Sequence, residues 1–311
     1  MPQAAPFFDD VACGPPGAVA EWLTADDGVR LRAAYWPKGN KGTVLMFPGR
    51  TEYIEKYGHA AGEFAAMGYA TACIDWRGQG LADRALDDPN TGHVLEFSDY
   101  QMDVAAMLAA MRARGLPEPY YLVAHSMGGC IGLRALMNGL PVNAAAFSAP
   151  MWGIAITGLL RPVAWSLSWF SRILGFGHAY APGTKPATYV QDAAFENNVL
   201  TTDREMFALM LRQVSEHPDL ALGGPSLQWP YEALQETRAM ANEPSPDMPA
   251  VAWLGGNERV VDTGPIHERM ARWPGGRLEI VEGAEHEVLM ETPDRRRRIY
   301  DGIAAHFAAH P

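Results

Sequence analysis

The chain alternates between short apolar runs and longer stretches in which apolar residues recur at helical spacing. Short, continuous apolar runs predict buried strands at residues 43–47, 70–75, 120–125 and 143–148, and two further strands are expected at 250–255 and 277–283. The alternating run at 29–36 predicts a half-exposed strand. Helices are expected at residues 56–67, 98–114, 127–138, 263–273 and 292–308, the last with Thr292 as its N-cap and Pro293 in its first turn. Continuous apolar strands separated by helices predict an α/β fold, with a mostly parallel central sheet that helices cover on both faces.

This alternation stops after Met151, and strands resume only at Ala250. The intervening segment is rich in Gly, Pro and large aromatic residues, including Trp152, Trp165, Trp169, Phe170 and Trp229. Loops that follow parallel strands emerge at the carboxyl edge of the sheet, where ligands bind in folds of this class. We therefore expect an insertion that caps a site at this edge, with a further layer of core as the alternative.

One serine stands where a predicted strand meets a predicted helix. The segment Ala124-His125-Ser126-Met127-Gly128 follows the pattern G-x-S-x-G, except that alanine replaces the first glycine. In that pattern the serine lies on a sharp, strained turn that exposes its hydroxyl, and the N-terminus of the next helix favours negative charge there. Ser126 is therefore the candidate nucleophile of an acyl-transfer site.

A serine nucleophile needs a histidine base, and on this kind of turn the chain order is serine, acid, histidine. Among the histidines after the insertion, His267 lies in a predicted helix, and His306 and His310 close the terminal helix. His286 lies in "EGAEHEVL", a loop that follows a strand, which is the required position. We predict that His286 is the base.

The carboxylate that would orient this histidine has two candidates. Glu258 follows the tip of the strand at 250–255, and Asp262 could either cap the next helix or act as the acid. Glu258 is favoured because it lies closer to the strand end, and Asp262 stays as the alternative. Glu285 and Glu287 flank the histidine, but adjacent side chains in an extended loop point apart.

The oxyanion formed in acyl transfer needs two backbone N–H donors. We expect one from Met127, the residue after the nucleophile, and one from the loop after the strand at 43–47. That loop reads Pro48-Gly49-Arg50-Thr51. Gly49 allows a tight turn, so the amide of Arg50 is the expected second donor.

Two other charged motifs are interpreted as structural. Asp75 and Arg77 in "IDWRGQG" could form a catalytic pair, but we expect a structural ion pair that supports the neighbouring loops. The "RRRR" run at 295–298 could suggest a phosphate site. At helical spacing it wraps most of the way round its helix, so a solvated face is expected instead.

Composition limits the class of protein. At 311 residues, 48% of them hydrophobic, the chain can bury a sizeable core as one α/β domain, with or without an insertion. Its 36 acidic and 25 basic residues give a formal net charge of −11. This acidity argues against nucleic acid as a partner and against charge-driven docking on anionic membranes.

Cysteine usage and hydropathy indicate the cellular compartment in which the protein is expected. Cys13, Cys73 and Cys130 are odd in number and widely spaced, so we expect buried free thiols in a reducing compartment. The first residues lack the basic and apolar regions of a secretory signal, which makes a cytoplasmic protein the default. Residues 135–160 carry no charge, but Asn and Pro interrupt the run, so no transmembrane helix is expected.

Taken together, these motifs resemble those of the α/β-hydrolases in the monoacylglycerol lipase and bacterial lysophospholipase branch. "FPGRTEYIEKYGHAAGEFAAMGYATACIDWRGQGLADR" (47–84) is similar to the bacterial lysophospholipase pattern throughout. "HSMGG", "GGNERVVD" and "GAEHEVLME" then follow in the order of the family, and the resemblance covers roughly residues 20 to 308.

The resemblance implies a role for each candidate residue. Ser126 would be the nucleophile, His286 the base and Glu258 the acid, with oxyanion amides from Arg50 and Met127. It also implies an α/β-hydrolase core formed by residues 1–150 and 236–311, with residues 151–235 as a helical lid. Two departures from the family are Ala124 in the first glycine position and Glu258 where many relatives carry Asp, and the second keeps Asp262 open.

The expected activity is that of a serine ester hydrolase working through an acyl-enzyme, with no metal or cofactor required. The aromatic insertion suggests an apolar acyl chain, and the resemblance makes a lysophospholipid or monoacylglycerol the leading substrate. Such a substrate would bring a cytoplasmic enzyme transiently to the inner membrane surface. The alternatives are hydrolysis of small esters, amides or peptides by the same fold, and a catalytically silent binding protein.

Overall fold

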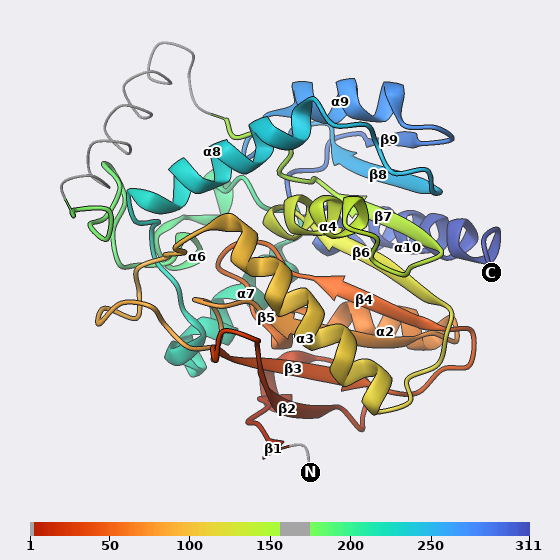
Figure 1. Ribbon diagram of the computed structural model, residues 1–311, viewed down its shortest axis with the longest axis horizontal. Coiled ribbons are helices and arrows are strands. Elements are labelled where there is room, and N and C mark those ends of the chain that lie inside the picture. The colour runs from red at the N-terminus through yellow and green to blue at the C-terminus, as the bar shows by residue number, and fades with distance from the viewer. Residues whose placement is uncertain (1–2, 156–174) are drawn as a thin grey trace.

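A single mixed sheet runs through the molecule (Figure 1). The computed structural model describes residues 3–155 and 175–311, and within them the strands follow the order β1-β2-β3-β5-β4-β6-β7-β8-β9. The strands are β1 (Gln3–Ala4), β2 (Val19–Thr24), β3 (Arg30–Trp36), β4 (Thr43–Phe47), β5 (Ala70–Asp75), β6 (Tyr120–His125), β7 (Ala144–Ser148), β8 (Ala250–Gly255) and β9 (Arg277–Val281). Strands β4 to β9 pair in parallel, and β1, β2 and β3 add an antiparallel edge beside β5.

Helices cover both faces of this sheet. The α-helices are α1 (Asp9–Ala12), α2 (Gly58–Ala66), α3 (Tyr100–Ala113), α4 (Met127–Met137), α6 (Tyr189–Asp192), α7 (Arg204–Glu216), α8 (Gln228–Ala241), α9 (Thr263–Arg272) and α10 (Pro293–Ala308). Short 3-10 helices are η1 (Ile54–Tyr57), η2 (Phe97–Asp99), η3 (Phe195–Asn197), η4 (Pro218–Leu220) and η5 (Val288–Met290). One apolar cluster joins α3, α4, α8 and α9 to one face, and a second joins α2 and α10 to the other. The ribbon in Figure 1 shows how these helices lie along the sheet.

The parallel register brings the ends of several strands to one edge. Phe47 at the end of β4 lies beside Ala124 in β6, and His125 lies beside Ser148 at the end of β7. The loops that leave β4, β6, β8 and β9 therefore begin close together, although the residues they carry are far apart in sequence. All the candidate catalytic residues are in these loops or in the first residue of the helix that follows.

The predicted strands and helices are present with small shifts at their ends, but two interpretations of the N-terminal part were wrong. Strands β1 and β2 were not predicted, and β2 has a buried carboxylate, Glu21, at its centre, which breaks the apolar pattern. Strand β3 is not half-exposed, because Arg32 is fully buried and pairs with Glu55 and Asp75. A paired buried charge looks the same in sequence as a solvent-facing one.

The expected ion pair between Asp75 and Arg77 is also wrong, because each residue binds another partner. Asp75 accepts from Arg32 Nε at 2.7 Å, and Arg77 bonds Asp103 and Asp27. Both residues are buried, so their role is structural, but they support different loops.

The terminal helix begins as predicted, with Thr292 as N-cap and Pro293 at its first position. The arginine run on it is only partly solvated. Arg295 bonds Glu291 and Arg296 bonds Asp203, whereas 297–298 are exposed. These contacts neutralise half of the run, so it does not form a free basic patch.

The segment between β7 and β8 contains helices α6, α7 and α8. The predicted lid aromatics Trp165, Trp169 and Phe170 lie outside the described residues. The predicted lid boundary at residue 235 falls inside α8. Whether this insertion acts as a lid stays a prediction.

All three cysteines are free thiols. Cys73 and Cys130 are buried as expected, but Cys13 is exposed, because it lies at the end of the short surface helix α1. Among the described residues, no helix is both long and apolar enough to cross a membrane.

Candidate active site

Ser126 lies on the strained turn between β6 and α4. Its backbone has φ 48° and ψ −117°, a conformation that non-glycine residues rarely adopt. The surroundings hold it there, since its amide donates to the carbonyl of Ser148 at 3.0 Å and its carbonyl accepts from Met151 and Gly129 at 2.8 Å. This turn presents the hydroxyl at the carboxyl edge of the sheet.

Small residues after the serine let helix α4 approach neighbouring backbone. A Cβ atom on Gly128 would lie 2.2 Å from the carbonyl oxygen of Phe47, and one on Gly129 would lie 2.5 Å from Pro150. Any side chain at Gly128 would therefore push the helix away from the loop after β4. That close approach brings the Ser126 turn beside the loop that carries Arg50.

The structure brings three of the predicted residues into one chain of hydrogen bonds. His286 Nε2 lies 3.0 Å from Ser126 Oγ, and His286 Nδ1 lies 2.7 Å from a carboxylate oxygen of Glu258. The other carboxylate oxygen of Glu258 accepts from the amides of Val260 and Val261 at 2.6 and 3.1 Å. Residues separated by as many as 160 positions in sequence thus meet with the geometry that activates a serine hydroxyl.

The carboxylate of Glu258 is ionised in this setting. Burial raises the pKa of Glu258. The hydrogen bond and charge of His286, together with the amides of Val260 and Val261, lower that pKa by more than burial raises it, so the net shift is downward. Asp262, the alternative acid, instead caps α9 by accepting from the amide of Gly264 at 3.1 Å. Of the two candidates, only Glu258 contacts the histidine within the described residues.

In the turn formed by residues 48–51, the amide of Arg50 has no acceptor among the described residues. The Gly49 amide donates to Glu52, and the Thr51 amide donates to Gln79 at 3.1 Å. Within the described part of the chain, no acceptor is found for the Arg50 amide between them. The Met127 amide, in the first turn of α4, likewise has no intrahelical acceptor, so both predicted oxyanion donors are available.

The Arg50 side chain was not considered in the sequence analysis, and its position is unusual. The guanidinium donates to the carbonyl of Gly223 at 2.7 Å and lies 5.2 Å from the ring of Trp229. Its Nε atom is buried and has no hydrogen-bond partner among the described residues. Burial lowers the pKa of Arg50 to about 10, because no carboxylate compensates its charge.

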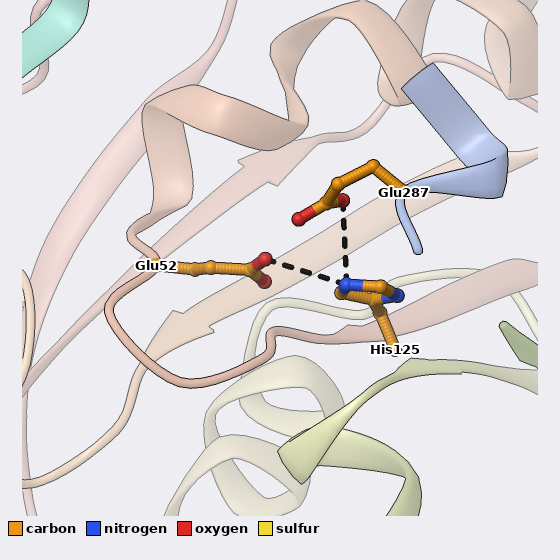
Figure 2. A group of neighbouring side chains, drawn as sticks. All are labelled: Glu52, His125 and Glu287. Carbon is orange, nitrogen blue, oxygen red and sulfur yellow. Dashed lines mark ion pairs between the residues drawn. The ribbon is translucent and has the colours of Figure 1, made fainter. Parts of the chain in front are cut away.

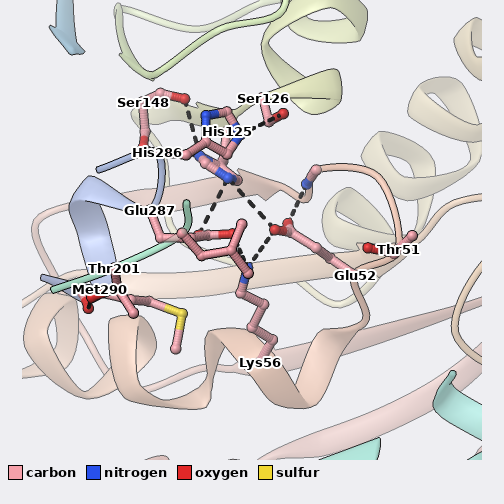
Figure 3. Close-up of polar contacts among 12 residues, drawn as sticks. Thr51, Glu52, Lys56, His125, Ser126, Ser148, Thr201, His286, Glu287 and Met290 are labelled. Carbon is pink, nitrogen blue, oxygen red and sulfur yellow. Dashed lines mark hydrogen bonds and ion pairs between the residues drawn. The ribbon is translucent and has the colours of Figure 1, made fainter. Parts of the chain in front are cut away.

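A second group of buried polar residues lies behind the triad and was missed by the sequence analysis. We name Glu52, Lys56, His125 and Glu287 the buried quartet (Figure 3). Lys56 Nζ bonds Glu52 and also Glu287 at 2.6 Å, and His125 Nε2 lies 3.5 and 3.3 Å from the same two carboxylates. The signal in sequence was adjacency, because His125 precedes the serine and Glu287 follows the histidine.

Three quartet residues also have the donor types of a metal site. Ligand atoms of Glu52, His125 and Glu287 lie within 4.8 Å of one another, and Figure 2 shows the two carboxylates converging on the imidazole. However, the ammonium of Lys56 already bonds both carboxylates. His125 Nδ1 lies 3.0 Å from the carbonyl of Ser148, so its ring is held by a protein acceptor. A cation of the protein therefore already occupies the position between the two carboxylates, which fits a metal ion poorly.

Comparison with known proteins places the chain in a family of hydrolases. Residues 38–293 match the family model described as "Serine aminopeptidase, S33". The chain is 32% identical to lysophospholipase L2 of Escherichia coli strain K12, over 94% of this chain and 87% of the relative. It is 30% identical to a probable lysophospholipase L2 of Haemophilus influenzae, over 84% and 82% of the two chains.

Solved structures share the fold at lower identity. Monoglyceride lipase from Saccharomyces cerevisiae, crystallised as a soluble variant with a substrate analogue, superposes with a TM-score of 0.72 at 19% identity. That match covers 93% of this chain and 94% of the other. At this identity the likeness extends to the fold alone.

Proposed function

Because this chain belongs to the serine aminopeptidase S33 family of α/β-hydrolases, we propose that it cleaves the acyl ester of a lipid-like substrate through a serine acyl-enzyme. The observation that carries the proposal is the hydrogen-bonded chain from Ser126 through His286 to Glu258. Lysophospholipase L2 of Escherichia coli, similar over nearly the whole chain, supports a carboxylic ester as the substrate.

The mechanism follows from the contacts of each residue. His286 Nε2 takes the proton of Ser126 as Oγ attacks the acyl carbonyl, and Glu258 stabilises the imidazolium that forms. The amides of Arg50 and Met127 would bind the oxyanion of the tetrahedral intermediate. His286 then protonates the departing alkoxide, and water, deprotonated by the same histidine, releases the acid. Every proton moves through His286, so the scheme uses no cofactor.

The uncompensated guanidinium of Arg50 favours a lysophospholipid over a monoacylglycerol. Arg50 has no ion-pair partner among the described residues, and the ranges 1–2 and 156–174 contain no Asp or Glu. A half-buried charge without a counter-ion is costly, and a phosphate matches the guanidinium fork. The backbone amide of Arg50 is itself a proposed oxyanion donor, so a head-group phosphate bound by its side chain would remain close to the ester.

Hydrolysis of an amide or peptide is the second candidate, because the family description names an aminopeptidase. The same triad can cleave either bond, so substrate tests must separate them. For a lipid substrate, we also propose transient contact with a membrane surface, since such substrates reside there.

The test is hydrolysis of matched substrates by the wild-type protein and by Ser126→Ala. We expect the wild type to release fatty acid from lysophosphatidylcholine and monoacylglycerol faster than it cleaves aminoacyl amides, and Ser126→Ala to release none above background. Preferential cleavage of the amides would replace the ester proposal with the peptidase. Equal ester hydrolysis by Ser126→Ala would remove the serine mechanism altogether.

A further inference from the structure

The buried quartet connects the loops that carry Arg50, Ser126 and His286. Glu52 lies in the loop of the Arg50 amide, His125 directly precedes Ser126, and Glu287 directly follows His286. Lys56 in η1 bonds both carboxylates. All four side chains are nearly inaccessible, with residue exposures of 1% to 6%. In Figure 3 the quartet lies directly beneath the Ser126–His286 pair.

The contacts of His125 fix its protonation. Nδ1 lies 3.0 Å from both the carbonyl oxygen and the hydroxyl oxygen of Ser148, and because the carbonyl can only accept a hydrogen bond, Nδ1 carries a proton that the two oxygens share. Nε2 faces the carboxylates of Glu52 and Glu287 at 3.5 and 3.3 Å, and these also only accept. A bare lone pair at Nε2 would be repelled by both, so His125 is an imidazolium with two protons.

Charge balance within the quartet supports this assignment. Although burial lowers the pKa of His125, the carboxylates of Glu287 and Glu52 raise it more, and the net shift is upward. Although burial raises the pKa of Glu287, His125 and Lys56 hold it well below its usual range. Two carboxylates are therefore matched by one ammonium and one imidazolium, which makes the quartet neutral.

This neutral group lies against the catalytic base. The ring centroids of His125 and His286 are 4.9 Å apart, and the charge of His286 also acts on Glu287. At such a distance in a buried site, an unbalanced charge would interact strongly with protonated His286. On its other sides His286 faces Ser126 and Glu258, and beyond it Glu285 pairs with Arg259.

We propose that the buried quartet is a positioning unit, in which the His125 imidazolium balances Glu52 and Glu287 so that no net charge perturbs the protonation of His286. The inference rests on the proposed hydrolase, in which His286 must be unprotonated to act as base. It makes His125, Lys56, Glu52 and Glu287 positioning residues, since none of them touches the reacting atoms.

Other titratable groups around the quartet do not change this balance. Those facing it are Tyr53, Tyr57, Cys73, Tyr300 and His59. Burial raises the pKa of the tyrosines and of Cys73 and lowers the pKa of His59, so all of them stay neutral in the working range. Glu55 and Asp75 lie further off and are paired with Arg32. The charge acting on His286 is therefore set by the quartet and by Glu258.

The test measures kcat/KM against pH in the wild type and in two variants, and compares the acidic limb, where activity falls as the base becomes protonated. His125→Gln removes one positive charge, leaves the quartet at −1 and should move this limb to higher pH by about one unit. His125→Gln/Glu287→Gln restores neutrality and should bring the limb back toward the wild-type position. Rates are normalised to folded enzyme by titration with a fluorophosphonate.

If the quartet had only a structural role, the double variant should be perturbed more than His125→Gln, because the second lost contact would add to the effect of the first. If the limb fails to move in His125→Gln, or moves further in the double variant, the proposal is overturned. A second measurement needs no variant to fold. Nitrogen NMR of wild-type protein labelled in histidine should find both His125 nitrogens protonated at neutral pH, and one bare nitrogen would overturn the proposal even if hydrolysis were never detected.

Discussion

Two histidines lie side by side in this site and face different partners. His286 Nε2 lies 3.0 Å from the hydroxyl of Ser126, which can both donate and accept a hydrogen bond. His125 Nε2 faces two carboxylates, which only accept. The first ring can therefore give up and regain a proton, whereas the second must keep both of its protons. The partners of one nitrogen decide whether an imidazole serves as a base or as a fixed cation.

The same contrast separates the triad from the buried quartet. The triad places one ionised carboxylate against one histidine and leaves Ser126 at the edge of the sheet. The quartet pairs two carboxylates with two cations and exposes almost nothing. In the triad, one nitrogen of His286 faces a hydroxyl and can therefore lose or gain a proton. In the quartet, both nitrogens of His125 face acceptors, so its protonation stays constant.

The largest expected effect separates the two histidines directly. His286→Ala should lower kcat on the preferred ester by at least ~10⁴-fold, because no other group can take the serine proton. Above the acidic limb, His125→Gln should lower it by no more than about 100-fold, since there the change acts only by shifting the position of the turn. Steady-state rates at a pH above the acidic limb provide the comparison. Losses of equal size would break the distinction between base and fixed cation.

The next effect concerns the two candidate acids. Glu258→Gln should reduce kcat by about 10³ to 10⁴-fold, because the amide cannot stabilise the imidazolium. Asp262→Ala is the matched control, which removes a helix cap, lowers stability by about 1 kcal/mol and changes kcat only a few-fold. Rates and urea unfolding of both variants give the answer. A larger loss of kcat in Asp262→Ala would reverse the assignment.

A smaller effect tests the guanidinium of Arg50, which has no carboxylate beside it, unlike the cations of the quartet. Arg50→Gln should lower the ratio of kcat/KM for lysophosphatidylcholine over monoacylglycerol of the same acyl chain by about 10-fold or more, as expected for a lost hydrogen bond to a charged group. The ratio cancels any shift of the Arg50 amide, because both esters form the same oxyanion.

Arg269→Gln is the control for this prediction. Arg269 is also buried, but it donates to the carbonyl of Met240 at the end of α8. Its loss should lower stability and leave the substrate ratio unchanged. An equal fall in both variants would mean that Arg50 does not contact the head group.

The smallest effect is on stability against acid. The pKa of Glu287 is held well below its ordinary value of 4.5, so its ionisation stabilises the fold fully above about pH 4.5. That contribution is lost as the pH falls from there toward the folded pKa. Glu287→Gln should therefore flatten the fall of Tm below pH 4.5, and a curve as steep as that of the wild type would count against the charged quartet.

Much of this fold could be predicted because most of its parallel strands have a recognisable sequence pattern. The parallel strands are buried on both faces, so they form continuous apolar runs such as 120–125 and 250–255. The mostly parallel sheet expected from them is present, and the α/β-hydrolase fold that the resemblance implied is confirmed by the family model and by solved structures. Strand β2 was missed because Glu21 is buried within it and bonded to Arg114 at 2.7 Å, a contact that no local pattern reveals.

The candidate site divides in the same way. Ser126, His286 and Glu258 each follow a strand, so their order and loop positions could be predicted, and the structure brings them together. The quartet was not predicted, because its carboxylates and cations come from three separate segments and their pairing exists only in three dimensions. Glu287 was set aside because it points away from His286, and that orientation directs it to Lys56 and His125.

The central claim is that the hydroxyl of Ser126 is the nucleophile, made reactive by His286. The most direct measurement is mass spectrometry of the protein after reaction with a fluorophosphonate, followed by peptide mapping. We predict one adduct per chain, located on Ser126, with loss of ester hydrolysis in proportion to labelling. An unlabelled Ser126 in protein that still hydrolyses esters, or an adduct on another residue that abolishes activity, would contradict the account.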